Sequence, residues 1–203
     1  MKTATFTMQG KAPYAQSRYL VVPKLEKETA DAYERRVWKT RMHTSEDPII
    51  DEETGQVRMP GTVHIPAMAL KMALDAAAKY LSIPVPGKGK STYTKHFMSG
   101  VLCTLDIDLG VPAEEVVGKW IWANADGVRG SGKRVARCYP HIKIGWSGQA
   151  SVDILDELVT EDVFTRVLNG AGAMIGIGQF RAERGGTNGR FIVKDLRFSK
   201  LVI

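Results

Sequence analysis

Alternating and helical patterns of apolar residues mark the first elements of the chain. Residues 3–9 alternate polar and apolar side chains, which is typical of a strand with one buried face. Residues 66–81 start with proline, which suits a first helical turn, and continue with apolar side chains at helical spacing. A second amphipathic helix starts at Thr160, whose hydroxyl can accept hydrogen bonds from backbone amides. The apolar positions of the two helices are Leu70, Ala73, Leu74, Ala77 and Leu81, and Val163, Phe164, Val167, Leu168 and Ala171.

Further apolar runs predict the remaining strands and the fold class. Strands are expected at 101–109, 120–123, 135–146, 150–155 and 190–203. With the two helices, this order predicts an α/β (α+β) fold with a ferredoxin-like, RNA-recognition-motif-like sheet that has helices on one face only. A polar helix over 24–41 and a hairpin over 48–58 are expected to form an inserted subdomain around 24–60, within one domain of residues 1–203.

Composition is that of a soluble globular protein. Hydrophobic residues make up 44% of the chain and charged residues 25%, both ordinary values. We find neither an apolar run of about 18 residues, as a membrane span needs, nor the apolar region of a signal peptide, so we expect a cytoplasmic protein. Cys103 and Cys138 lack metal-ligand or disulfide-framework spacing and are expected to be free thiols.

Charge is distributed unevenly along the chain. The net charge of +6 is compatible with a polyanionic partner. The segments 86–100, 127–143 and 176–203 hold three, five and six basic side chains, and the first two hold no acid. This segregation predicts a basic face, although charged loops such as 86–100 and 126–134 can equally be solvated surface. The candidate nucleic-acid contacts in these two loops are Lys88, Lys90, Lys95, Arg129, Lys133 and Arg134, with Tyr93 and Phe97 as candidate rings for base stacking.

The most glycine-rich stretch lies between the second helix and the last strand. Residues 170–191 contain seven glycines and three arginines. Glycine lets another backbone approach closely, and arginine offers a planar, charged fork for phosphate. The stretch is interpreted as a grip on a nucleic-acid backbone, or as a structural turn that permits tight helix–strand packing, and both interpretations can hold together. Its candidate residues are Gly176, Gly178, Gly185, Gly186 and Gly189 for the backbone, and Arg181, Arg184 and Arg190 for phosphate.

Two segments resemble the repeat-associated mysterious protein (RAMP) superfamily, the RNA-recognition-motif-like proteins of CRISPR effector complexes. One is the glycine-rich stretch, with Ala171-Gly172, Gly176-Ile177-Gly178-Gln179-Phe180-Arg181, Gly185-Gly186 and Gly189-Arg190-Phe191. The other is 66–74, which is similar to the lysine-bearing start of the first helix in the superfamily and adds Lys71 to the candidate nucleic-acid contacts. The likeness is strongest to the subunit that polymerises along guide RNA. The chain is shorter than those subunits, and a compact phage or mobile-element relative fits that length equally.

The resemblance implies a non-catalytic, multimeric protein that binds RNA or another single strand in antiviral defence. It implies partners among effector-complex subunits or further copies of the chain, in the cytoplasm of a bacterium or an infected bacterial host. Two alternatives stay open: a protein-binding anti-defence or structural subunit that mimics an effector subunit, and a RAMP-type endoribonuclease with His43 or His64 as general base. The histidines have no metal-ligand spacing, and we predict no metal, no cofactor and no catalytic residue.

Overall fold

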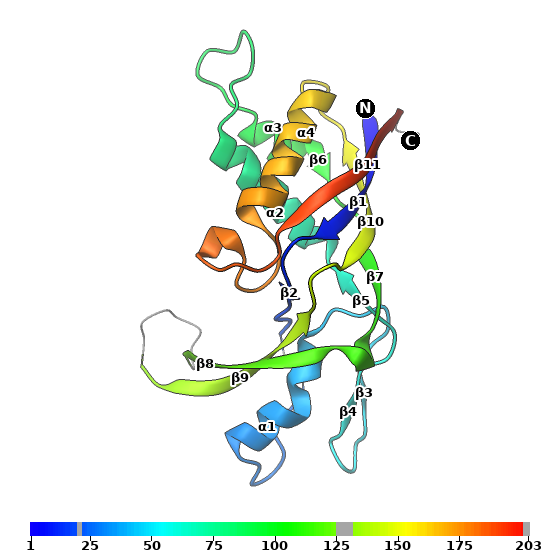
Figure 1. Cartoon of the computed structure of the whole chain (residues 1–203), viewed down its shortest axis with the longest axis vertical. Helices are drawn as coiled ribbons and strands as arrows, with labels where there is room; N and C mark the ends of the chain where they lie inside the picture. Colours follow the sequence, from blue (N-terminus) through cyan, green and yellow to red (C-terminus); the bar gives the residue numbers. More distant parts are fainter. Residues whose placement is uncertain (20–21, 125–131, 201–203) are drawn as a thin grey trace. The chain divides into compact units, whose positions relative to one another are not determined.

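The computed structural model describes residues 1–19, 22–124 and 132–200, and the chain forms two units. Unit 1 contains Met1–Tyr14, Ile65–Leu109 and Lys143–Ile203, and unit 2 contains Ala15–His64 and Gly110–Ile142. The chain therefore leaves unit 1 and returns to it twice, as the colours of Figure 1 follow. Residues 24–60 lie in unit 2 together with 110–142.

Unit 1 is built on a four-stranded antiparallel sheet. Its order is β11 (Phe191–Lys200), β1 (Lys2–Gly10), β10 (Ser147–Ile154) and β6 (Val101–Leu102). In sequence, α2 (Ala67–Leu81) lies between β1 and β6, and α4 (Glu161–Gly170) lies between β10 and β11. Each helix thus connects two strands that have a third strand between them, which is the split β-α-β arrangement of a ferredoxin-like sheet. The predicted mixed α/β, ferredoxin-like fold class is confirmed.

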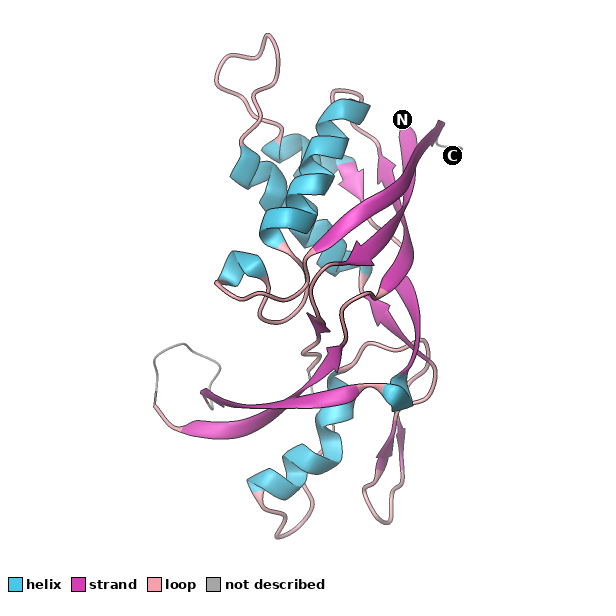
Figure 2. Cartoon of the chain, in the orientation of Figure 1, coloured by secondary structure: helices cyan, strands magenta, loops and turns pink. Residues whose placement is uncertain are grey.

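One face of this sheet packs against the helices, and the other is polar. Phe6 and Met8 of β1 and Val152 of β10 are buried. Phe164 of α4 stacks on Phe97 of α3 (Thr94–Gly100), with ring centroids 6.3 Å apart. Figure 2 shows the helices of this unit gathered on one side of its strands. The alternate residues of β1 and β10, which point to the other face, are Thr3, Thr5, Thr7 and Gln9, and Ser147, Gln149, Ser151 and Asp153.

Three elements differ from the sequence prediction. The strand expected over 101–109 is interrupted after β6 and resumes as β7 (Ile107–Pro112). The short helix α3 was not predicted. The helix expected over 24–41 starts only at Ala30, because the Thr29 side chain accepts a hydrogen bond from the Ala32 N–H at 3.1 Å and caps it there.

Unit 2 contains a long hairpin and one α-helix among its described residues. The hairpin strands β8 (Val117–Asn124) and β9 (Arg134–Ile142) are antiparallel, and β2 (Tyr14–Ala15) lies on the other edge of β9. The helix α1 (Ala30–Val37) packs against β9 and continues into a 3-10 turn, Trp38–Arg41. The predicted small hairpin is present as β3 (Ile49–Ile50) and β4 (Val57–Arg58). Finally, β5 (Thr62–Ile65) pairs with β7, and a single turn is present at Ala113–Glu115. The single turns Ala171–Ile175 and Ala182–Arg184 belong to unit 1.

Glu34 ties α1 to β9. Its side chain is 1% exposed, and its carboxylate accepts hydrogen bonds from Arg41 Nη2 at 2.9 and 3.0 Å. It also accepts from Arg137 Nη1 at 3.0 Å and from the Cys138 backbone N–H at 2.8 Å. A buried carboxylate is tolerated because each lone pair meets a donor, and removing one partner of such a cluster is costly. The cluster therefore fixes the hairpin against α1.

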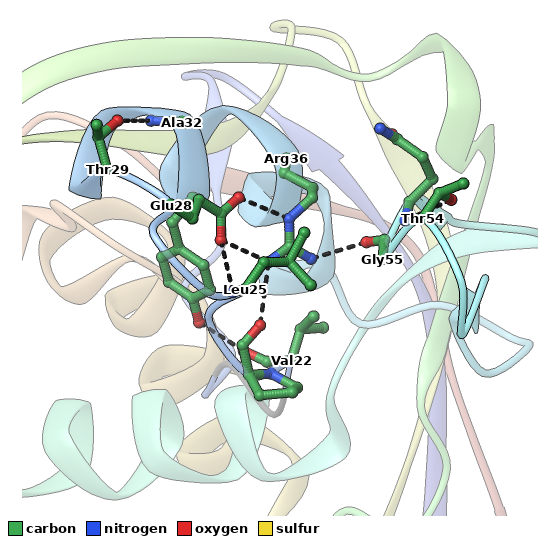
Figure 3. Close-up of polar contacts among 11 residues, drawn as sticks. Val22, Leu25, Glu28, Thr29, Ala32, Arg36, Thr54 and Gly55 are labelled. Atoms are coloured by element: carbon green, nitrogen blue, oxygen red, sulfur yellow. Dashed lines mark hydrogen bonds and ion pairs between the residues drawn. The ribbon is translucent and has the colours of Figure 1, made fainter.

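A second ion pair organises the start of unit 2, and Figure 3 shows Arg36 at its centre. Arg36 Nε and Nη2 each lie 2.8 Å from a carboxylate oxygen of Glu28. Nη1 donates to the Gly55 carbonyl at 2.7 Å, and Nη2 donates to the Pro23 carbonyl at 3.0 Å. The two charged side chains are only 7% and 8% exposed. One guanidinium thus links α1, the loop before it and the turn between β3 and β4.

Candidate nucleic-acid interface

The glycine-rich loop between α4 and β11 is closed by its own backbone. The Ile177 N–H donates to the Gly189 carbonyl at 3.1 Å, and the Asn188 N–H donates to the Phe180 carbonyl at 3.0 Å. The Gly189 N–H donates to the Pro13 carbonyl at 2.7 Å, which joins the loop to the segment after β1. The glycine amides that donate within the protein in this way are those of Gly176, Gly185, Gly186 and Gly189.

Gly186 and Gly189 have no room for a side chain. A Cβ at Gly186 would lie 1.8 Å from the Phe180 carbonyl oxygen, and one at Gly189 would lie 1.9 Å from the Ile177 carbonyl oxygen. The loop glycines with positive φ are Gly176 (73°), Gly178 (75°), Gly185 (75°) and Gly189 (72°). The structural-turn interpretation accounts for these contacts, so a phosphate contact in this loop rests on its arginine side chains.

The three arginines of the loop differ in how available they are. Arg181 is held by Glu183, whose carboxylate lies 2.9 Å from Nε and 2.8 Å from Nη2, and 25% of the Arg181 side chain is exposed. Arg184 is 73% exposed, and its Nε is 3.8 Å from the same carboxylate. Arg190 is exposed just before β11. Arg184 and Arg190 are therefore the two cations that this loop presents most openly.

The loop between α2 and α3 presents further cations. Lys88 and Lys90 are exposed and alternate with Gly87 and Gly89, which have φ values of 72° and 62°. Figure 1 shows this loop projecting from the helices of unit 1. Lys95 is exposed on α3, which follows the loop. The three predicted lysines thus lie on one short, open segment.

Lys71, in contrast, is engaged inside unit 1. Its Nζ lies 2.5 Å from Asp75 Oδ1 and donates to the carbonyls of Phe97 at 2.9 Å and Met98 at 3.2 Å. Its side chain is 12% exposed. An ammonium has three N–H donors, and here three acceptors surround it. The Lys71 ammonium is therefore occupied by acceptors of the protein itself.

The predicted stacking rings beside the lysine loop are buried. Tyr93 is 4% exposed and Phe97 is fully buried, so a base cannot stack on either. Beside them, His96 Nδ1 lies 2.6 Å from Asp156 Oδ2 and ties α3 to the segment before α4. Burial disfavours the charged carboxylate, but hydrogen bonds from His96 and the Leu158 N–H outweigh it, and the pKa of Asp156 is lowered.

The predicted basic loop of unit 2 is described only from residue 132 onward. Lys133 and Arg134 are exposed where β9 begins, and Arg134 lies opposite Asn124 of β8. Arg129 lies outside the described residues. The end of the β8–β9 hairpin thus presents two of the three cations that the sequence analysis assigned to this loop.

The exposed tryptophans Trp120 and Trp122 of β8 are not among the contacts predicted from the sequence. Their side chains are 41% and 71% exposed, and the Arg35 guanidinium lies 4.9 Å from the ring centroid of Trp120. The available signal was the alternation at 119–122, Lys-Trp-Ile-Trp, which places both rings on one face of a strand.

The histidines considered for a nuclease belong to a packed part of unit 2. The His64 N–H donates to the His43 carbonyl at 2.9 Å. The buried Gln16 side chain bridges the two residues, because it accepts from the His43 N–H at 2.8 Å and donates to the His64 carbonyl at 2.6 Å. These contacts use backbone groups and position both segments around Gln16.

Both cysteines are free thiols. Burial raises the pKa of Cys103 to about 12 and that of Cys138 to about 11, so neither ionises near neutral pH. In the described residues, no cluster of three or more His, Cys, Asp or Glu is arranged to hold a metal ion. None of the described helices is long and apolar enough to cross a membrane.

Comparisons with known proteins identify structural neighbours. No protein-family model matches the sequence, and no curated protein is similar to it. The crystal structure of Cmr6 from Pyrococcus furiosus is 14% identical, with a TM-score of 0.47 over 95% of this chain and 98% of that chain. A chain of the type III-B Cmr-β complex bound to cognate target RNA is 12% identical, with a TM-score of 0.46 over 98% of this chain and 61% of that chain. A chain of a CRISPR RNA-guided surveillance complex is 10% identical, with a TM-score of 0.40 over 95% of this chain and 66% of that chain.

Proposed function

We propose that this protein is a non-catalytic, nucleic-acid-binding subunit that takes RNA or another single strand in an effector-type complex. The observation that supports the proposal is the exposure of cations in all three basic segments. They are Lys88, Lys90, Lys95, Lys133, Arg134, Arg184 and Arg190. An exposed cation can neutralise a phosphate and release its counterion, and this supplies affinity without choice of sequence. The RAMP-like motifs are the reason for proposing an effector subunit rather than a general polyanion binder.

Salt dependence of binding tests the electrostatic part of the proposal. We expect a labelled single strand of about 20 nucleotides to bind at low salt, and log K to fall linearly with log salt up to about 0.5 M. Removing the exposed cations as K88A/K90A/K95A or as K133A/R134A should weaken binding by roughly 1–3 kcal/mol and flatten the salt slope. The matched control is K24A/K27A, which removes two exposed lysines outside the three segments. An affinity that stays flat as salt rises contradicts the proposal.

Incubation of labelled RNA with the protein, followed by a denaturing gel, tests the absence of catalysis. We expect the RNA to stay intact while it is bound. Cleavage of the RNA by the wild-type protein contradicts a non-catalytic role. If H43A or H64A abolishes this cleavage, the endoribonuclease alternative is supported. If cleavage persists in both variants, a residue other than these two histidines is the general base. Absence of binding at low salt instead supports the protein-binding subunit.

A further inference from the structure

Two tryptophans share one face of the β8–β9 hairpin. Trp120 and Trp122 are two residues apart in β8, so both rings leave the strand on the same side. Trp122 is 71% exposed, and the residue opposite it in β9 is Ala136, whose single methyl group covers little of an indole ring. Trp122 therefore presents most of a large aromatic surface to solvent.

Among the described residues, cover over the face that carries these rings is seen at its Gly118 end and over Trp120. At Gly118, a Cβ would lie 2.3 Å from Cys138 Sγ, so this end of the face is closed. Over Trp120 lies the Arg35 guanidinium of α1, whose Nε is held 2.8 Å from Asp31 Oδ2. Trp122 follows two residues farther along, and Figure 1 shows the far ends of β8 and β9 running beyond α1. Arg35 of α1 thus covers part of the Trp120 ring, while the Trp122 ring stays largely exposed to solvent.

The strands around Trp122 carry only basic charge. Residues 117–124 and 132–142 contain Lys119, Lys133, Arg134 and Arg137 and no acidic side chain. Arg134 lies opposite Asn124, two residues beyond Trp122. An open indole among cations is complementary to a single strand, which offers an aromatic base face and a phosphate at every nucleotide. In a duplex the base faces are already stacked on one another, so the ring finds no partner.

We propose that Trp122 is a stacking platform for an unpaired base, with Trp120 and Arg35 behind it and Lys133 and Arg134 as the neighbouring phosphate contacts. The inference rests on the proposed nucleic-acid binding and makes it more specific, because it assigns an unpaired strand rather than a duplex as the ligand. The stacking interaction does not depend on which base is present, since every base has a π-face.

Oligouridylate, an abasic strand of the same length and a duplex of the same length are the probes. With the wild-type protein, oligouridylate should quench the intrinsic tryptophan fluorescence and bind more tightly than the abasic strand or the duplex. W122A should lose most of the quenching and bind oligouridylate roughly 5- to 100-fold more weakly, with unchanged affinity for the abasic strand. W122F, which keeps a ring, should recover part of the loss.

Tyr80→Ala is the matched control, because Tyr80 is an aromatic side chain that is 66% exposed on α2 and belongs to none of the three basic segments. It should bind all three probes as the wild type does. Equal affinity of W122A and wild type for oligouridylate overturns the inference, and so does an equal loss on the abasic strand. The inference is also overturned if the tryptophan fluorescence of the wild type changes with protein concentration but not when nucleic-acid strands are added. That result would identify this face as a contact between copies of the protein. If wild type binds oligouridylate and the abasic strand equally, only the stacking inference fails; if it binds neither at low salt, the proposed function fails.

Discussion

Gly186 shows how closely single residues are constrained in the glycine-rich loop. We expect Gly186→Ala to lower the free energy of unfolding by about 3 kcal/mol, because its Cβ would meet the Phe180 carbonyl oxygen at 1.8 Å and the loop must open to admit it. Thermal and urea unfolding of the purified variant measure the change.

Gly185→Ala is the control for this prediction. Gly185 has a φ of 75°, and no atom lies within 4 Å of the position that its Cβ would take, so alanine there adds backbone strain of about 1 kcal/mol without a collision. Equal stability of the two variants would show that the contact between Gly186 and Phe180 does not hold the loop together.

The sequence identified candidate cations but did not reveal which of them are available to a ligand. Lys71 and Lys88 are the same residue type, yet three acceptors surround the ammonium of Lys71 while Lys88 is exposed in a loop. The acceptors of Lys71 include carbonyls 26 and 27 residues away in sequence, and no local pattern reports such contacts. The same holds for Phe97, whose ring stacks on Phe164 of α4, a contact that the local sequence does not report.

At the scale of elements, the ion pair that anchors α1 makes unit 2 sensitive to acid. The hydrogen bond from Arg36 lowers the pKa of Glu28 from 4.5 to about 2; burial opposes this effect, and the Leu25 N–H adds to it. A carboxyl with a lowered folded-state pKa stabilises the fold above its unfolded pKa. We therefore expect this stabilisation to be complete above about pH 4.5 and to disappear as the pH falls towards 2.

Glu28→Gln tests this acid sensitivity. The variant should melt at a lower temperature than wild type at pH 7, and the difference should narrow as the pH falls from 4.5 towards 2. Glu26→Gln is the control, because the Glu26 side chain is 90% exposed and lies 3.9 Å from Lys27. A difference between Glu28→Gln and wild type that is independent of pH would mean that the charge of Glu28 does not contribute.

The elements with strong local patterns were predictable, and those set by tertiary contacts were not. Residues 66–81 carry an uninterrupted helical period, and α2 occupies 67–81. The strand predicted over 120–123 is longer, 117–124, because its pairing with β9 continues past the aromatic residues that signalled it. The polar helix α1 has few apolar residues, and it starts where the Thr29 side chain caps it, so its first residue was not evident from the apolar pattern.

For the whole molecule, the proposed function predicts assembly along a strand. One copy offers only the exposed cations of its three basic segments, so affinity on a long strand gains from neighbouring copies held by the same polymer. We expect native mass measurements on single strands of increasing length to give a ladder, with one copy added for each fixed number of nucleotides. One copy per strand at every length contradicts multimeric binding and favours the protein-binding alternative.

The central place of β1 in its sheet has a consequence for synthesis on the ribosome. Both partners of β1 come late in the chain, since β10 occupies 147–154 and β11 occupies 191–200. At roughly 5–20 residues per second, β1 waits about 7–30 s for its first partner to be made. Throughout that time Phe6 and Met8 have no sheet in which to be buried, so β1 is the segment of unit 1 that is exposed longest to chaperones and to unwanted strand pairing on the ribosome.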